Sequence, residues 1–152
     1  MYIFEHSQIL KADSGTLIDF FSDVSKLDGN TPWFFRLQLL EGRPGGQLEK
    51  GQRFRYKFRL FGIPFPWTTL IDEVEEDYFV DSQEQGVYKS FRHIHAFLPR
   101  GEATLMLDKI AYELPFGPLN PIVNTLAVRP MLSAIFSFRA ARAAERFGEV
   151  RL

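Results

Sequence analysis

The sequence predicts an α+β domain in which one curved antiparallel sheet is covered by a long carboxy-terminal helix. Residues 34–112 alternate apolar and polar side chains with period two between turn-forming residues, as consecutive antiparallel strands do. Residues 119–147 instead repeat apolar side chains at helical spacing. A sheet with one apolar face needs a cover, and only this last segment is long enough to provide one.

Composition limits the class of protein. The 152 residues fit a single domain that spans residues 1–152. The 18 basic and 19 acidic side chains nearly cancel, so we expect no nucleic-acid partner. The absence of cysteine excludes disulfides and thiolate metal sites. The amino terminus does not resemble a signal peptide, and charges interrupt every apolar run before the ~20 residues of a membrane span. We therefore expect a cytoplasmic protein without stable membrane insertion.

The first elements are a strand and two short helices. Residues 2–10 alternate weakly and predict the strand. Residues 12–16 supply side-chain oxygens that cap helices, so a first helix is expected over residues 14–21. Residues 22–27 predict a second short helix, which residues 28–32 would end.

Turn signals then divide the alternating region into about six strands. They lie near residues 42–51, 62–66, 76–77, 85–86 and 99–101. In the third strand the apolar face holds Phe54, Tyr56, Phe58 and Leu60, and the opposite face holds Arg53, Arg55, Lys57 and Arg59. We interpret the basic row as a solvated face, because the net charge is near zero. The first strand is free to pair with the last.

The carboxy-terminal segment should close the domain but not as one straight helix. Its apolar residues at helical spacing are Ile122, Val123, Leu126, Leu132, Ile135, Phe136 and Ala143. Pro130 cannot donate a backbone hydrogen bond, so we expect a break there. Arg139, Arg142 and Arg146 are interpreted as structural cations near the negative end of the helix dipole.

The most concentrated polar chemistry lies on the strand 91–97, whose pattern is Phe-x-His-x-His-x-Phe. Period-two alternation places both histidines and both phenylalanines on one face. If Phe97 pairs with Thr104 on the next strand, His95 faces Met106 and His93 faces Asp108. We therefore predict a contact between His93 and Asp108.

The order of elements and four segments resemble the SRPBCC (START/Bet v 1-like) superfamily, and within it the ligand-binding, polyketide cyclase-like proteins. The segments are 61–67 (Phe-Gly-Ile-Pro-Phe-Pro-Trp), 79–83 (Phe-Val-Asp-Ser-Gln), the histidine strand, and 112–119 (Tyr-Glu-Leu-Pro-Phe-Gly-Pro-Leu). The resemblance implies a helix-grip fold: a curved seven-stranded antiparallel sheet around the last helix, two short helices between strands one and two, and a deep apolar cavity. It implies less about activity, because the superfamily holds lipid-transfer domains, allergens, aromatase/cyclases and oxygenase domains.

Three interpretations of the pair His93 and Asp108 stay open. They can satisfy each other in a core, orient a polar group of a ligand, or act as catalytic acid and base. The His-x-His spacing also occurs in metal sites, where His6, Glu73, Asp81 or Asp108 would add ligands. The spacing requires none of these, so we expect no metal and no cofactor.

Other side chains should share the face of the histidines. Asp81 and Gln83 lie at even spacings from Phe79 and so share its face of the strand. Glu73 shares a face with Trp67, Thr69 and Ile71 in the same way. The 16 phenylalanines exceed what a compact core needs, which favours a lined cavity. Loops at residues 31–34, 61–67 and 114–121 are the expected gates. The candidate ligand-binding residues are Phe54, Tyr56, Phe58, Trp67, Asp81, Gln83, Phe91, His93, His95, Met106, Asp108, Tyr112 and Phe136.

Three functions follow from this pattern. The leading hypothesis is the binding or carriage of a small hydrophobic molecule, such as a lipid, a polyketide or an aromatic metabolite. An alternative is an aromatase/cyclase- or dehydratase-like enzyme that uses His93 and Asp108. A third is a protein-interaction module or homodimer that associates through residues 61–66.

Overall fold

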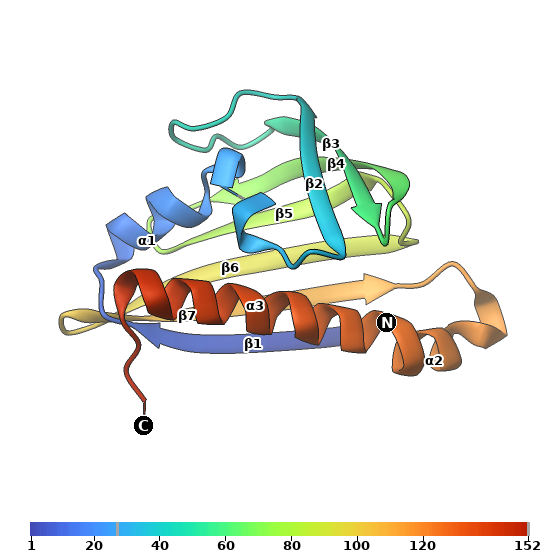
Figure 1. The fold of residues 1–152 in the computed structure, drawn as a ribbon. Helices are drawn as coiled ribbons and strands as arrows, with labels where there is room; N and C mark the ends of the chain where they lie inside the picture. Colours follow the sequence, from blue (N-terminus) through green and yellow to red (C-terminus); the bar gives the residue numbers. More distant parts are fainter. Residues whose placement is uncertain (27, 152) are drawn as a thin grey trace.

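The computed structural model describes residues 1–26 and 28–151, and its strands form one sheet (Figure 1). Seven strands pair antiparallel in the order β1-β7-β6-β5-β4-β3-β2. The first strand pairs with the last, as the sequence predicts. The strands are β1 (Tyr2–Leu10), β2 (Phe35–Glu41), β3 (Arg53–Leu60), β4 (Ile63–Val74), β5 (Tyr78–Gln85), β6 (Ser90–Arg100) and β7 (Ala103–Glu113).

The segment between β1 and β2 holds α1 (Ser14–Phe21) and two short 3₁₀ turns, η1 (Val24–Lys26) and η2 (Asp28–Asn30). The expected first helix is confirmed, and its cap is Asp13, whose Oδ2 accepts from the Thr16 backbone N–H at 3.0 Å. The second helix is reduced to η1, because the Asp23 carboxylate binds the Ser25 backbone and hydroxyl and so favours a tight turn. Leu27, at the end of that predicted helix, lies outside the described residues.

Strand β3 has the predicted faces, with Phe54, Tyr56 and Phe58 buried. The turn expected over residues 62–66 is wrong, because β4 already begins at Ile63. The turn consists of Phe61 and Gly62 alone, both with positive φ (49° and 82°), as in a two-residue hairpin. Prolines fit the start of β4 because its pairing with β5 begins only at Thr68, which leaves one edge without ladder bonds.

The carboxy-terminal segment forms one helical run, Gly117–Phe147, and the expected break at Pro130 is wrong. A π-helical turn precedes the proline, and Arg129, which lies between that turn and Pro130, keeps helical angles (φ −64°, ψ −45°). The wider turn changes the hydrogen-bond pairing just where the proline lacks a donor, so the helix continues. The run consists of η3 (Gly117–Leu119), α2 (Asn120–Val123), η4 (Asn124–Val128) and α3 (Arg129–Phe147).

This helix lies along the sheet beside β1 and β7 (Figure 1). Its buried residues in α3 are Leu132, Ile135, Phe136 and Ala143, the positions that the sequence predicts. Ile122 and Leu126, which were expected to be core residues, are 58% and 75% exposed. By length and composition, the run is the one helix within residues 1–26 and 28–151 that could cross a membrane, a property shared by core helices of soluble proteins.

The π-helical turn is tied to the sheet by one buried hydrogen bond. The Tyr112 hydroxyl of β7 donates to Asn124 Oδ1 at 2.5 Å. Tyr112→Phe leaves that amide oxygen unsatisfied, so we expect a loss of about 1–3 kcal/mol in the free energy of unfolding, measured by urea denaturation. Tyr2→Phe is the matched control, because the Tyr2 ring packs on Tyr112 while its hydroxyl forms no hydrogen bond with another described residue. Equal effects of the two substitutions would contradict this role for Tyr112.

Candidate functional site

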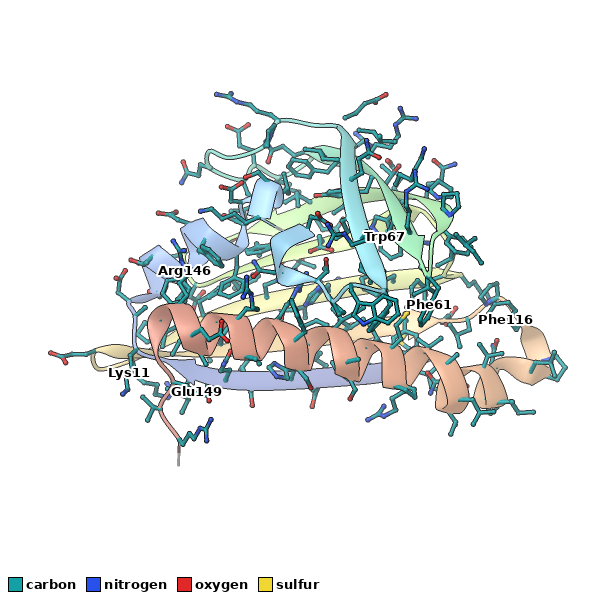
Figure 2. The ribbon with its side chains drawn as sticks, viewed as in Figure 1. Lys11, Phe61, Trp67, Phe116, Arg146 and Glu149 are labelled. Carbon is teal, nitrogen blue, oxygen red and sulfur yellow. The ribbon has the colours of Figure 1, made fainter. Side chains whose placement is uncertain are left out.

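A cavity of about 780 Å³ lies between the sheet and the carboxy-terminal helix. Its walls are mostly aromatic and aliphatic side chains, and its volume falls in the range of small-molecule pockets, roughly 300–1,000 Å³. Figure 2 shows Phe61 and Phe116 toward the end of the molecule that holds α2, where rings border the cavity. Of the candidate residues, those that line it are Phe54, Tyr56, Phe58, Trp67, Asp81, Phe91, His93, His95, Met106, Asp108 and Phe136.

Two candidate residues do not line the cavity, and this part of the prediction is corrected. Tyr112 is fully buried in the core and bonded to Asn124. Gln83 donates from Nε2 to the Tyr88 carbonyl and accepts at Oε1 from the Tyr88 N–H. Both polar ends of Gln83 therefore hold the loop between β5 and β6.

Glu73 lies on the opposite face of β4 from the one that strict alternation predicts. The pairing of β4 with β5 skips one residue between Ile71 and Glu73, which is a β-bulge. Beyond the bulge the faces exchange, so Glu73 lies outside the cavity and accepts from the Tyr78 hydroxyl (3.2 Å) and from Arg92 (3.3 Å). The sequence does not mark this bulge.

The register of β6 and β7 differs by two residues from the prediction. His95 faces Asp108, and His93 faces Ile110. The connection is the two-residue turn at Gly101 and Glu102, with Gly101 at φ 64°, so the ladder extends to Arg100 and Ala103. The predicted contact is nevertheless present, because His93 reaches Asp108 diagonally: Nε2 to Oδ1 is 2.8 Å.

Four side chains form one polar group in the cavity wall, which we name the His–Asp cluster: Asp81, His93, His95 and Asp108. His95 Nε2 lies 2.6 Å from Asp81 Oδ2, and His95 Nδ1 lies 3.4 Å from Asp108 Oδ1. The two imidazole centroids are 3.6 Å apart. His95 therefore sits between two carboxylates, whereas His93 has one.

The two histidines have opposite pKa shifts. Burial alone would lower the pKa of His95, but its contacts with Asp108 and Asp81 outweigh burial and raise that pKa to about 9. Burial and the neighbouring charge of His95 lower the pKa of His93, and the bond to Asp108 does not compensate. At neutral pH His95 is charged and His93 is neutral.

Both carboxylates stay ionised in spite of burial. Burial would raise the pKa of Asp81 and of Asp108, but the imidazoles lower both below the usual range. The cluster thus pairs one imidazolium with two carboxylates. Its second cation comes from the helix.

Arg139 of α3 lines the cavity, a position that sequence reasoning missed by treating it as a structural cation at a helix end. Its guanidinium carbon lies 5.3 Å from the centre of the Phe136 ring. Burial lowers the pKa of Arg139, and Asp108 and Asp81 oppose this shift. The available signal was helical spacing, because Arg139 lies three residues after Phe136 and four before Ala143, which are both buried.

The cluster also has the composition of a metal site. Ligand atoms of Asp81, His93 and His95 lie within 4.8 Å of one another. A cation there would replace the proton that His95 and Asp81 share at 2.6 Å, so metal binding and the charged state of His95 exclude each other. The expectation of no metal stays a prediction.

Comparison with solved structures identifies the fold. A protein of Thermus thermophilus has a TM-score of 0.72 at 14% identity, covering 95% of this chain and 99% of that one. A START superfamily protein of Mycobacterium smegmatis has a TM-score of 0.72 at 15% identity, covering 96% and 99%. The di-domain ARO/CYC protein StfQ of the steffimycin biosynthetic pathway has a TM-score of 0.67 at 14% identity, covering 95% of this chain and 51% of StfQ.

These likenesses confirm the expected fold: the chain has the helix-grip architecture that these solved structures share. No protein-family model matches the sequence, and no curated protein matches it. At less than 25% identity, structural likeness shows the fold but not the ligand, which has to be inferred from the geometry of the cavity.

The charged state of His95 predicts a pH dependence of stability. Its pKa of about 9 in the folded protein lies above the ~6.5 of an unperturbed imidazole. The folded state keeps a proton that the unfolded chain releases, so this contribution is present below about pH 6.5 and is lost as the pH rises through about 9. The free energy of unfolding of the wild type, measured with urea, should fall on the order of 1–3 kcal/mol across this pH window. In His95→Gln this fall should be absent.

Asp81→Asn is the companion variant for this titration. It removes one of the two carboxylates that raise the pKa of His95, so its stability should decrease with pH less than that of the wild type. A decrease of equal size in the wild type and in His95→Gln would refute the assignment.

Proposed function

We propose that the chain binds or carries a small hydrophobic molecule, such as a lipid, a polyketide or an aromatic metabolite, in its central cavity. The observation that carries this proposal is the cavity of about 780 Å³ under the sheet, lined by phenylalanines from β2, β3, β4 and β6. Burying an apolar ligand there gains roughly 25 cal/mol for each Å² removed from water. Rigid rings suit a flat or extended ligand, because they lose little freedom on binding.

The mouth of the cavity supports uptake of an apolar molecule. We define the mouth as Phe34, Phe61, Phe116 and Leu126, which line the cavity and come from three separate segments. Phe61, Phe116 and Leu126 are exposed, and the Phe34 and Phe61 rings stack at 5.4 Å. These residues fall in or beside the segments that the sequence indicates as gates.

The proposal extends to partners and location. The small molecule is the expected partner, and the near-zero net charge argues against nucleic acid. A cytoplasmic location without stable membrane insertion fits a helix whose buried face packs on the sheet. A homodimer through the exposed Phe61 and Ile63 stays a further proposal.

Filling the cavity should block binding. Met131 lines the cavity on α3, and Met131→Trp adds volume there, so affinity for the polarity-sensitive dye N-phenylnaphthylamine should fall about tenfold or more in a fluorescence titration. Ser133→Trp is the matched control, because Ser133 is exposed on the same helix and should leave the affinity within about twofold. A wild-type protein that binds no apolar dye would refute the proposal.

A second candidate function is an aromatase/cyclase- or dehydratase-like enzyme. The observation that favours it is the pair of neighbouring imidazoles in opposite states, both lining the cavity. Two titratable groups whose environments separate their pKa values are suited to act as acid and base. His95 would donate a proton, and His93, oriented by Asp108, would accept one.

This acid–base assignment can be tested without a substrate. In ¹⁵N NMR of the imidazoles at neutral pH, His95 should give the shifts of an imidazolium and His93 those of a neutral ring, because only His95 contacts two carboxylates. His93→Gln leaves the His95 signals in place to identify them. Two neutral rings at pH 7 would exclude His95 as the acid.

A further inference from the structure

Two hydrogen-bond donors lie in the cavity wall without an acceptor. Arg139 comes from α3 and Tyr56 from β3, so they approach the cavity from the helix and from the sheet. Among residues 1–26 and 28–151, neither side chain has a hydrogen-bond acceptor or an ion-pair partner. Two exposed arginines of the same helical run differ, because Arg129 donates to the Ile3 carbonyl and Arg142 approaches Glu145. The exposed Arg146 resembles Arg139 in that its contacts are with aromatic rings, those of Phe20 and Phe147.

The two donors line the same cavity, and their charges influence each other. The positive charge of Arg139 favours a lower pKa of the Tyr56 hydroxyl, and the negative charge of Asp81 raises the pKa of both groups. Burial raises the pKa of Tyr56, so the phenol keeps its proton and can donate. The ring of Phe136 satisfies only one face of the guanidinium, whose N–H groups lie in its plane.

The charges around these donors already cancel. Asp81 and Asp108 contribute two negative charges, and His95 and Arg139 contribute two positive charges, while His93 is neutral. An anionic ligand would leave an excess negative charge in an apolar cavity, which is costly. An uncharged acceptor satisfies the donors without changing this balance.

We propose that Arg139 and Tyr56 form a subsite for the carbonyl oxygen of an uncharged, mainly apolar ligand. This inference rests on the proposed function and specifies its ligand class: a ketone, quinone, ester or amide on an apolar skeleton. A carbonyl oxygen has two lone pairs and no proton, so it accepts hydrogen bonds from donors of both kinds and offers them no competing donor. The rest of the skeleton would occupy the aromatic part of the cavity.

The test compares three naphthalene dyes of similar size. N-Phenylnaphthylamine has no oxygen acceptor, prodan has a ketone, and anilinonaphthalene sulfonate has an anion. Arg139→Met should lower the affinity for prodan about tenfold, as expected when a hydrogen bond from a charged donor is lost. The affinity for N-phenylnaphthylamine should change by less than about twofold. The emission of bound prodan should shift to the blue, because its ketone loses a donor.

Two further variants keep the result interpretable. Tyr56→Phe should lower prodan affinity about threefold to tenfold, which tests the subsite if Arg139→Met does not fold. Arg142→Met is the matched control, since Arg142 lies on the same helix with an exposed side chain, and prodan affinity should stay unchanged.

The outcomes separate the two proposals. If wild-type protein binds none of the dyes, the proposed function fails. If it binds N-phenylnaphthylamine but Arg139→Met and Tyr56→Phe leave prodan affinity and emission unchanged, the carbonyl subsite alone is overturned. If Arg139→Met weakens the sulfonate dye far more than prodan, the ligand class is anionic, and the inference of an uncharged carbonyl is wrong.

Discussion

The rest of the cavity depends on two carboxylates that lie in its wall beneath the helix, Asp108 buried and Asp81 half-buried. Asp81 and Asp108 cannot remain ionised there without partners, because an unpaired charge in such surroundings costs several kcal/mol, on the order of 3–5. His95 lies between them and His93 beside Asp108. These contacts cross β5, β6 and β7, so the same interactions that pair the carboxylates with imidazoles also align these strands of the sheet. Asp108 Oδ2 remains buried without a hydrogen-bond partner among the described residues.

The two histidines of the His–Asp cluster contact different numbers of carboxylates, and this difference sets their protonation states. His95 contacts two carboxylates and is charged, whereas His93 contacts one carboxylate and a charged neighbour and stays neutral. Arg139 completes the charge balance from the helix side. The result is a polar wall that is nearly neutral as a whole, set in a chamber of phenylalanine rings. Such a wall favours ligands with a few hydrogen-bonding atoms over ligands with a net charge.

The fold was largely predictable from local patterns. The alternation in β3, the helix cap within residues 12–16 and the buried stripe of α3 each depend on neighbours within a few residues, and each is confirmed. The errors have a common cause in interactions that local patterns do not contain. The π-helical turn continues the helix past Pro130, the bulge turns Glu73 outward, and the tight turn at Gly101 shifts the β6–β7 register by two residues.

The candidate site divides in the same way. The sequence by itself determined which face of β6 carries the two histidines and that this face is aromatic, because side chains alternate strictly along a strand. Only the tertiary structure decided that His95 also contacts Asp81, that Gln83 holds a loop, and that Arg139 reaches the cavity. The physical reason is distance along the chain: strand register and the placement of a helix over a sheet arise from packing between segments, and each segment's own pattern is compatible with several such arrangements.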